Sequence, residues 1–300
     1  MTPIVSNYTL LFDGTFLFLT LTSIILLLLI TFFMLYFVVK YNRKRHPLAQ
    51  QTEGSLILEI IWTVAPTVLV LVMFYYGWVN FSYMRNAPEG ALPVKVTGMQ
   101  WSWQFEYKNG KQSDVLNVPL GKPVELIMTS ADVIHSLYIP AFRIKEDAVP
   151  GMKTHLWFTA SEIGSYDIFC TEYCGVGHSH MLSKVVVMTG EEFEKWYGSA
   201  APQGAVERGL NLLQVKGCLG CHSTDGSSKI GTTYKGIFGR KETVITGGKE
   251  REIIADEAYL RKSVLQPAAD IVKGYPNIMP TIPVTPQELD DIVAALKSLK

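Results

Sequence analysis

The chain has 300 residues, enough for one large domain or two to three small ones. Its 27 basic and 27 acidic side chains cancel, so no bulk charge indicates nucleic acid or another polyanion as a partner. Charged residues make up only 18% of the chain, against a typical share of about 25%, and the deficit falls at the N-terminal end. The four cysteines form two close pairs inside metal- or haem-type motifs, which argues against a disulfide framework.

Two long uncharged runs predict a transmembrane helical hairpin in residues 1–90. Residues 14–39 carry no charge and would form a helix of about 39 Å, enough to cross roughly 30 Å of hydrocarbon. A cleaved signal peptide is the competing interpretation, but the run is too long and no basic residue precedes it. The second predicted span covers about residues 60–84, with Pro66 near its start.

Basic residues predict the orientation of this hairpin. The connection between the spans holds Lys40, Arg43, Lys44 and Arg45. The segment before the first span has Asp13 and no basic side chain, so the positive-inside rule places the connection in the cytoplasm and both chain ends outside. Glu59 lies at the edge of the second span. An intramembrane carboxylate is a functional candidate by default, and a headgroup-level residue near a helix end is the alternative.

Residues 91–197 have the pattern of an all-β domain. In residues 101–107 (WSWQFEY) the aromatic side chains fall at every second position, as in a half-buried strand. Asn109-Gly110 indicates a hairpin turn. Many short strands with turns about every 8–12 residues are typical of a sandwich or small barrel. The predicted strands are 94–97, 101–107, 124–129, 135–139, 154–159, 164–169 and 183–188.

The densest group of metal-binding side chains lies in residues 170–181 (CTEYCGVGHSHM). The spacing C-x3-C-x3-H-x2-M is formed by Cys170, Cys174, His178 and Met181. A further histidine, His135, lies earlier in the chain. Soft sulfur and imidazole ligands select copper or zinc over magnesium or calcium, and a thioether favours copper. The cluster therefore predicts a copper electron-transfer centre.

The number of cysteine thiolates distinguishes between the kinds of metal site that this cluster could form. A mononuclear blue copper site needs one Cys, two His and a weak Met, so one thiolate here would be left over. Two thiolates can instead bridge two copper ions, each capped by one imidazole. A structural Cys2His2 zinc site is the alternative, but it leaves Met181 unexplained. His180 is expected beside the site or on the surface, and His155 and His46 on the surface or in loops.

This cluster, with residues 132–136 (DVIHS) and 100–103 (QWSW), closely resembles subunit II of haem–copper cytochrome c oxidases. The resemblance covers about residues 10–190, includes the helical hairpin, and implies a cupredoxin-like Greek-key domain with a dinuclear copper centre, CuA. It implies that Cys170 and Cys174 bridge the coppers, that His135 and His178 cap them, and that Met181 is the weak ligand.

The same resemblance implies roles for three further residues. Glu172 would lend its backbone carbonyl to copper, while its side chain reaches a magnesium ion shared with subunit I. Trp101 falls where electrons enter in that family. Glu59, in residues 59–63 (EIIWT), matches the glutamate that opens the K proton pathway. Met99 departs from the pattern, since many members have His there.

A linker, residues 198–204, leads to a different domain, residues 205–300. Cys218, Cys221 and His222 form C-x-x-C-H, the signature of covalent c-type haem attachment with the imidazole as iron ligand. A thioredoxin-like motif would need a βαβ context, and zinc would need two more ligands where no Cys or His follows His222. Met279 is the one methionine beyond His222, and methionine opposite histidine is an axial pair of cytochromes c. A core or loop methionine, with the iron left open, is the alternative.

Helices are expected to frame this domain. It resembles class I cytochromes c over about residues 204–300, which implies an all-α fold. Residues 206–216 lead into the haem motif, and Asp256 can cap a helix over 257–265. Thr285, Pro286 and Glu288 have the pattern of a capping box that begins the last helix.

The order of hairpin, copper domain and tethered cytochrome is similar to subunit II of caa3-type oxidases. The resemblance implies that haem c passes electrons to CuA and on to haem a, haem a3 and CuB of subunit I, where O2 is reduced to water with proton pumping. It implies subunit III as a further partner, quinol:cytochrome c reductase or a small cytochrome c as donor, and the bacterial plasma membrane as location. This chain cannot hold the oxygen site, because none of its six histidines lies in either span.

Two other functions stay open. A stand-alone membrane electron-transfer protein would carry the same motifs without an oxidase partner. Nitrous oxide reductase shares a CuA-type motif, but its catalytic cluster needs many more histidines than this chain has. A quinol-oxidising subunit II would lack the copper ligands that are present here.

Overall fold

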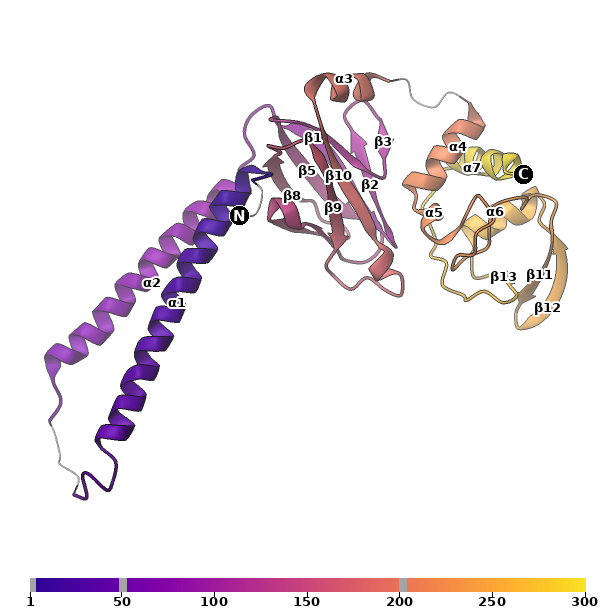
Figure 1. The fold of residues 1–300 in the computed structure, drawn as a ribbon. Helices are drawn as coiled ribbons and strands as arrows, with labels where there is room; N and C mark the ends of the chain where they lie inside the picture. Colours follow the sequence, from indigo (N-terminus) through magenta and orange to yellow (C-terminus); the bar gives the residue numbers. More distant parts are fainter. Residues whose placement is uncertain (1–3, 49–52, 200–203) are drawn as a thin grey trace. The chain divides into compact units, whose positions relative to one another are not determined.

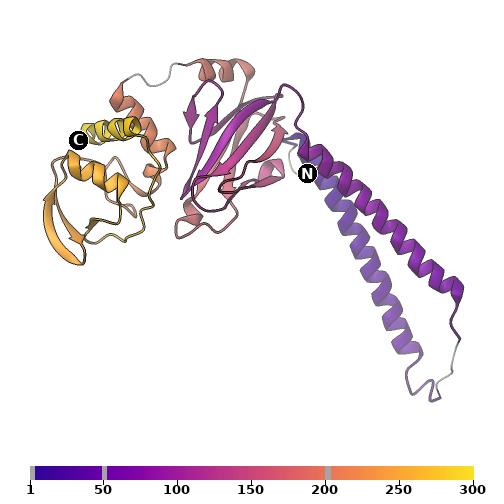
Figure 2. The same cartoon turned by 180° about the vertical axis from the view of Figure 1, so that it is seen from behind.

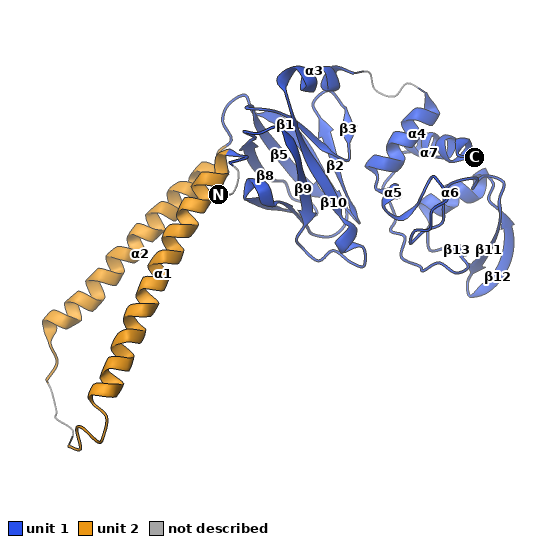
Figure 3. Ribbon diagram, in the orientation of Figure 1, with its two compact units in different colours: residues 1–6, 87–300 blue, residues 7–86 orange. Residues whose placement is uncertain are grey.

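The computed structural model describes residues 4–48, 53–199 and 204–300. The chain divides into two compact units, which Figure 3 shows in different colours. Residues 7–86 form one unit, and residues 87–300 with the first six residues form the other. The first unit is a pair of helices, and the second contains a β-rich region and a C-terminal region (Figure 1). The predicted linker 198–204 lies mostly outside the described residues.

The helical unit consists of α1 (Asn7–Lys40) and α2 (Leu56–Arg85). Both helices are long and apolar enough to cross a membrane, with mean hydropathies of 2.7 and 2.3. Asn80 Nδ2 donates a hydrogen bond to Thr15 Oγ1 at 2.6 Å, joining the two helices. Hydrogen bonds of this kind hold helix pairs together in lipid. The structure has a helix over each predicted span, and each helix continues beyond its uncharged run at both ends.

The β-rich region is a sandwich of two five-stranded sheets (Figures 1 and 2). The first sheet has the order β3-β2-β1-β5-β8, with β1 and β5 parallel and the other neighbours antiparallel. Its strands are β1 (Leu92–Met99), β2 (Ser102–Tyr107), β3 (Gln112–Ser113), β5 (Pro123–Ser130) and β8 (Thr154–Thr159). The second sheet has the order β4-β10-β9-β6-β7. Its strands are β4 (Leu116–Pro119), β6 (His135–Ile139), β7 (Ile144–Ala148), β9 (Gly164–Cys170) and β10 (Leu182–Met188).

Alternating side chains fill the space between these sheets. In β5, residues Val124, Leu126 and Met128 are fully buried, while their neighbours are partly exposed. Trp103 of β2 and Ile168 of β9 are buried from opposite sheets. Burying alternate apolar side chains is the main stabilising contribution in such a sandwich. All seven predicted strands are present, and the pattern missed β3, β4 and β7.

Short helices complete this region. The 3-10 turns η1 (Pro140–Phe142) and η2 (His178–His180) lie between strands, and α3 (Gly190–Gly198) follows β10. Thr189 and Glu192 form a reciprocal capping box at the start of α3, so its first backbone N–H groups are satisfied. Phe193 of α3 is buried.

The C-terminal region contains helices and a small sheet. Its helices are α4 (Ala205–Val215), α5 (Cys218–Cys221), α6 (Glu257–Leu265) and α7 (Pro286–Ser298), and its strands are β11 (Lys241–Thr246), β12 (Lys249–Ile254) and β13 (Ile271–Val272). The predicted capping box of Thr285 and Glu288 is confirmed at α7. The expectation of an all-α domain is wrong. Gly247 and Gly248 both adopt positive φ, 56° and 81°, which suits the tight turn joining β11 to β12.

Helices α4 and α7 are held together by close packing and one ion pair. The Gly209 position lies so close to α7 that a Cβ there would be 1.9 Å from the Asp291 carbonyl oxygen. Arg208 makes a two-point ion pair with the Asp291 carboxylate, Nε to Oδ2 at 2.8 Å and Nη2 to Oδ1 at 2.7 Å. Leu213, Ile292 and other buried apolar residues of the two helices lie in one core cluster.

Asp270 links α6 to the β11–β12 hairpin. Its side chain is 4% exposed, and its carboxylate pairs with Arg251 at 2.9 Å and Lys262 at 2.7 Å and accepts from the Thr246 hydroxyl. Burial raises the pKa of Asp270, but the bonds from Lys262, Thr246 and Arg251 outweigh it and hold that pKa well below its usual range. The stabilisation is therefore present above the unfolded-state pKa of about 3.9 and is lost as pH falls towards the folded-state pKa.

We expect Asp270→Asn to lower the stability of the hairpin at neutral pH by about 1–3 kcal/mol, because it removes the charge from a buried hydrogen-bonded group. The loss should shrink as pH falls below about 4, because the unfolded wild-type chain then takes up a proton at Asp270 and the stabilisation from the folded, ionised carboxylate is progressively lost. Amide hydrogen exchange in β11 and β12 at several pH values measures both effects. Asp290→Asn, which removes a 53% exposed carboxylate paired with Arg261, is the matched control. A similar change in both variants would contradict the prediction.

Candidate metal centre

Neighbouring strands of the second sheet bring the predicted copper ligands together. His135 begins β6 and Cys170 ends β9, and these strands pair with Leu137 opposite Cys170. The chain then runs from Cys170 through a loop to η2, which contains His178, and returns into β10 directly after Met181. A loop supported by two paired strands can hold several side chains at fixed positions.

The ligand atoms lie within a few ångströms of each other. Cys170 Sγ and Cys174 Sγ are 3.8 Å apart, and Cys174 Sγ is 3.5 Å from His178 Nδ1 and 3.8 Å from Met181 Sδ. The potential ligand atoms of His135, Cys170 and Cys174 all lie within 4.8 Å of one another. The Sγ–Sγ separation is a non-bonded contact, which leaves both sulfurs free to bind metal.

The His135 side chain has a nitrogen lone pair, on Nδ1, that no hydrogen-bond donor occupies among the described residues. Its side chain is fully buried, and Nδ1 has no hydrogen-bond partner among the described residues. Nε2 lies 2.7 Å from Asp132 Oδ1, and because a carboxylate only accepts, Nε2 carries the proton. Nδ1 therefore has a free lone pair in a buried site, which is what a metal ligand requires.

The two thiols cannot both ionise easily without a cation. At Cys170 burial disfavours the thiolate, but the neighbouring His135 imidazole and hydrogen bonds from backbone groups outweigh burial and lower the pKa. At Cys174 burial and the adjacent Cys170 thiolate raise the pKa. Two thiolates in contact need positive charge between them, which bound metal supplies.

The donor set favours copper over zinc. Two thiolates and two imidazoles suit either metal, but the Met181 thioether is fully buried at the site. Thioether is a soft ligand that copper accepts and structural zinc sites do not use. The Glu172 carbonyl oxygen lies 3.2 Å from Cys170 Sγ, while the Glu172 side chain is exposed. His180 is also exposed, outside the cluster.

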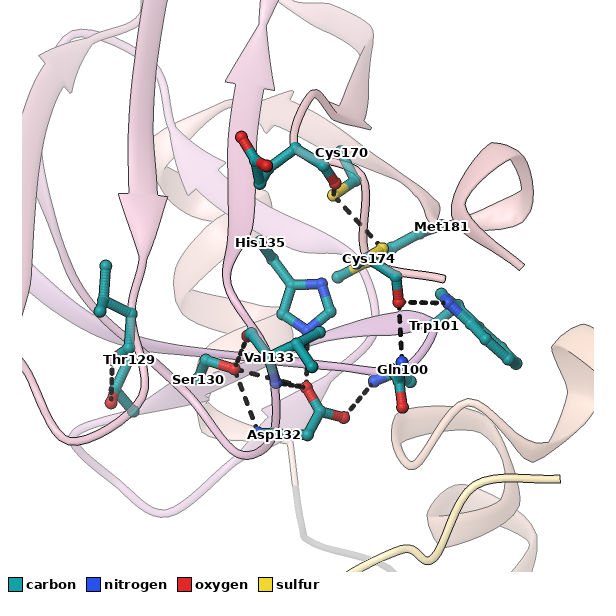
Figure 4. Close-up of polar contacts among 12 residues, drawn as sticks. Gln100, Trp101, Thr129, Ser130, Asp132, Val133, His135, Cys170, Cys174 and Met181 are labelled. Atoms are coloured by element: carbon teal, nitrogen blue, oxygen red, sulfur yellow. Dashed lines mark hydrogen bonds and ion pairs between the residues drawn. The ribbon is translucent and has the colours of Figure 1, made fainter. Parts of the chain in front are cut away.

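Trp101 lies directly against the loop that joins Cys174 to His178 (Figure 4). Its Nε1 donates to the Cys174 carbonyl at 3.0 Å. The indole can approach because residue 177 is glycine: a Cβ there would lie 2.3 Å from Trp101 Cδ2. The aromatic ring that was predicted to admit electrons therefore contacts the loop between Cys174 and His178.

The predicted haem ligands share a second site, in the C-terminal region. Cys218, Cys221, His222 and Met279 all line one cavity. Apolar side chains, among them Ile237, Leu260, Val264, Ile278 and Ile282, line it with them. An apolar cavity with a few convergent polar groups is typical of a cofactor site.

The orientation of His222 suits an iron ligand. Its Nδ1 donates to the Thr232 carbonyl at 2.7 Å, which leaves the Nε2 lone pair available. The imidazole stacks on Tyr234, with ring centroids 4.4 Å apart. Gly231 allows the close approach, since a Cβ there would be 2.6 Å from His222 Cε1. Burial lowers the pKa of His222 and so favours the neutral imidazole that metals bind.

Glu59 lies in the first turn of α2, in the helical unit. The sequence patterns missed the supporting residues. Asp132 and Gln100 contact the copper ligands, but they were noted only as parts of longer segments. The available signal was an acidic residue three positions before His135, because ligating histidines commonly donate to a carboxylate.

A β-sandwich with a soft-ligand cluster at one end, attached to two membrane-length helices, defines a membrane-anchored copper electron-transfer protein. A family model described as the transmembrane domain of cytochrome c oxidase subunit II matches residues 1–77, and one for the periplasmic domain of that subunit matches residues 111–189.

Relatives of this chain extend the match. Cytochrome c oxidase subunit 2 of Alkalihalophilus pseudofirmus is 28% identical over 298 residues, which cover 93% of this chain and 85% of the relative. The subunit 2 of Thermostichus vulcanus is 31% identical, covering 65% of this chain and 74% of the relative. The alternative subunit 2 of Bradyrhizobium diazoefficiens is 30% identical, covering 65% and 82%. The chain belongs to the cytochrome c oxidase subunit II family.

Membership of this family confirms the coarser predictions. The protein is a membrane subunit of a haem–copper oxidase, with a transmembrane domain and a periplasmic domain. It transfers electrons through a CuA copper centre to subunit I.

Proposed function

We propose that this chain is subunit II of a caa3-type cytochrome c oxidase, with a covalent haem c in residues 205–300 that donates electrons to CuA. In this proposal residues 1–90 form the membrane hairpin, 91–197 the CuA domain and 198–204 the linker. Subunit I reduces O2 to water with proton pumping, subunit III is a further partner, and quinol:cytochrome c reductase or a small cytochrome c is the donor. The protein lies in the bacterial plasma membrane with both termini outside.

One observation carries the haem proposal: the C-x-x-C-H residues and Met279 line the same apolar cavity. Cys218 and Cys221 lie at the two ends of the single-turn helix α5, so both thiols can reach one macrocycle edge. His222 would bind the iron through Nε2, since Thr232 occupies Nδ1, and Met279 would supply a thioether ligand. The alignment with the Alkalihalophilus protein over 93% of this chain supports a shared C-terminal region.

The copper ligands in this proposal are His135, Cys170, Cys174, His178, Met181 and the Glu172 carbonyl. The bound copper pair and haem supply one-electron redox chemistry. The chain contributes the geometry that keeps these ligands fixed. A site whose geometry changes little during electron transfer has a low reorganisation energy. The exposed Glu172 carboxylate would reach the magnesium ion shared with subunit I, Trp101 would admit electrons, and Glu59 would open the K proton pathway.

Metal and haem content of the purified full chain tests the proposal. From a host that matures c-type cytochromes, we expect a copper pair and one haem that stays attached to the denatured chain. In Cys218→Ala/Cys221→Ala the covalent haem should be lost while copper content stays at the wild-type level. Haem staining of a denaturing gel and copper analysis measure the two outcomes separately. Zinc in place of copper, or no covalent haem in the wild type, would contradict the corresponding half of the proposal.

A further inference from the structure

Gln100 forms two hydrogen bonds that reach the two sides of the copper site (Figure 4). It lies in the turn between β1 and β2. Its backbone N–H donates to Asp132 Oδ2 at 2.7 Å, and its side-chain Nε2 donates to the Cys174 carbonyl at 2.7 Å. A carbonyl oxygen only accepts, so the amide nitrogen of Gln100 must face Cys174.

The first bond acts on the His135 side. Asp132 Oδ1 accepts from His135 Nε2 and from the Val133 N–H, each at 2.7 Å, while Oδ2 accepts from the Gln100 N–H. With both oxygens bonded, the carboxylate has one orientation. That orientation fixes the proton of His135 on Nε2 and leaves the Nδ1 lone pair free beside the sulfurs of Cys170 and Cys174.

The second bond acts on the Cys174 side. Cys174 lies between β9 and η2, outside the strand ladders. Its carbonyl receives two donors, Gln100 Nε2 and Trp101 Nε1, both from the β1–β2 turn. Cys174 Sγ is the atom with contacts to Cys170, His178 and Met181, so its backbone position sets three of the ligand distances.

We propose that Gln100 is the positioning residue that holds His135 and Cys174 at the separation the copper pair requires. The proposal rests on the ligand set of the proposed function. Gln100 does not contact the metal; it acts through Asp132 on one ligand and through a backbone carbonyl on the other. The copper site is thereby shaped by the protein before metal binds.

Gln100→Met tests this proposal in the full-length chain in detergent. Methionine has a similar length and keeps the backbone N–H to Asp132, but it removes the amide donor to Cys174. Affinity for copper should fall about 10–100-fold, the usual effect of losing a group that supports a metal ligand. The EPR and absorption spectra of the loaded site should change, and amide exchange at residues 171–177 of the metal-free chain should become faster.

Gln112→Met, the same substitution in edge strand β3 of the same sheet, is the matched control and should leave all three readouts unchanged. If Gln100→Met does not fold, Asp132→Asn tests the other bond, because an amide cannot accept on both oxygen positions; we expect a weaker and spectroscopically altered copper site. Wild-type affinity and spectra in either folded variant would overturn the proposal. Failure of the wild-type chain to take up copper would instead overturn the ligand set.

Discussion

Cys174→Ser should leave the chain unable to hold the copper pair. Cys174 Sγ is the central donor of the cluster, within 3.8 Å of the sulfurs of Cys170 and Met181 and 3.5 Å from His178 Nδ1. A serine hydroxyl is a hard and weakly acidic donor that stays protonated at neutral pH, so it cannot bridge two soft metal ions. We expect the affinity for the pair to fall by more than about 100-fold, a larger effect than losing a supporting residue.

Copper content per chain and the EPR spectrum after reconstitution measure this loss. Cys221→Ser is the matched control, because it removes a thiol from the haem motif and should leave the copper site as in the wild type. Serine is close to cysteine in size, so the fold of the sandwich should be kept, and far-ultraviolet circular dichroism can verify that. A normal copper pair in Cys174→Ser would show that the metal is held by other residues.

Gly209→Ala is expected to separate α4 from α7. Alanine in a helix interior is favoured over glycine by about 1 kcal/mol, which alone would stabilise α4. The new Cβ would lie 1.9 Å from the Asp291 carbonyl oxygen and 2.7 Å from Ala295 Cβ. Overpacking costs about 1–3 kcal/mol and more where the obstacle is backbone, so the clash outweighs the helix propensity. The net result should be a loss of about 2 kcal/mol or more in the stability of the packed α4–α7 pair.

Amide hydrogen exchange in α4 and α7 reports this region alone, which matters because a multi-domain chain does not unfold in one step. Leu210→Ala, at the neighbouring exposed position of α4, is the control. It should change the free energy of local opening, as measured by amide exchange, by less than about 0.5 kcal/mol. Equal protection in Gly209→Ala and wild type would mean that the helices can shift without cost. The cavity lined by Cys218, Cys221 and His222 should also loosen, since α5 follows α4 after only two residues.

The periodicity of apolar residues in the sequence was sufficient to predict the long helices and the strongly alternating strands. The spans, the strands from Val124, His135 and Thr154, and the last helix all have patterns that local side-chain preferences determine. The strands β3, β4 and β7 were missed because none of them alternates: β3 has only two residues, β4 is buried at all four positions, and β7 (IKEDA) has three charged residues in a row. Their pairing depends on neighbours in the sheet. Helix α3 has a capping box at Thr189 that could have been found.

The error in the C-terminal region came from a different source. The haem motif suggested a family fold, and the all-helical expectation followed the resemblance in place of the local sequence. Gly247-Gly248 between alternating residues is a hairpin signal that was present in the sequence. At the copper site, the motif picked out the soft side chains that the structure brings together. Asp132 could have been suspected from its place three residues before His135, but Gln100 could not be assigned, because a hydrogen bond between distant segments leaves no periodic pattern.

The hydrogen bond between Asn80 and Thr15 sets which part of α1 a distant carboxylate of α2 lies beside. It fixes the register of α1 against α2 near one end of the hairpin. Glu59 lies 21 residues earlier in α2, about 31 Å along the helix, which is close to one hydrocarbon thickness of about 30 Å. A slip of one helical turn at Asn80 would move the Glu59 carboxylate by about 5.4 Å along α1. In a bilayer that distance is enough to carry a carboxylate between headgroups and hydrocarbon, so the depth of Glu59 would depend on an amide about one hydrocarbon thickness away.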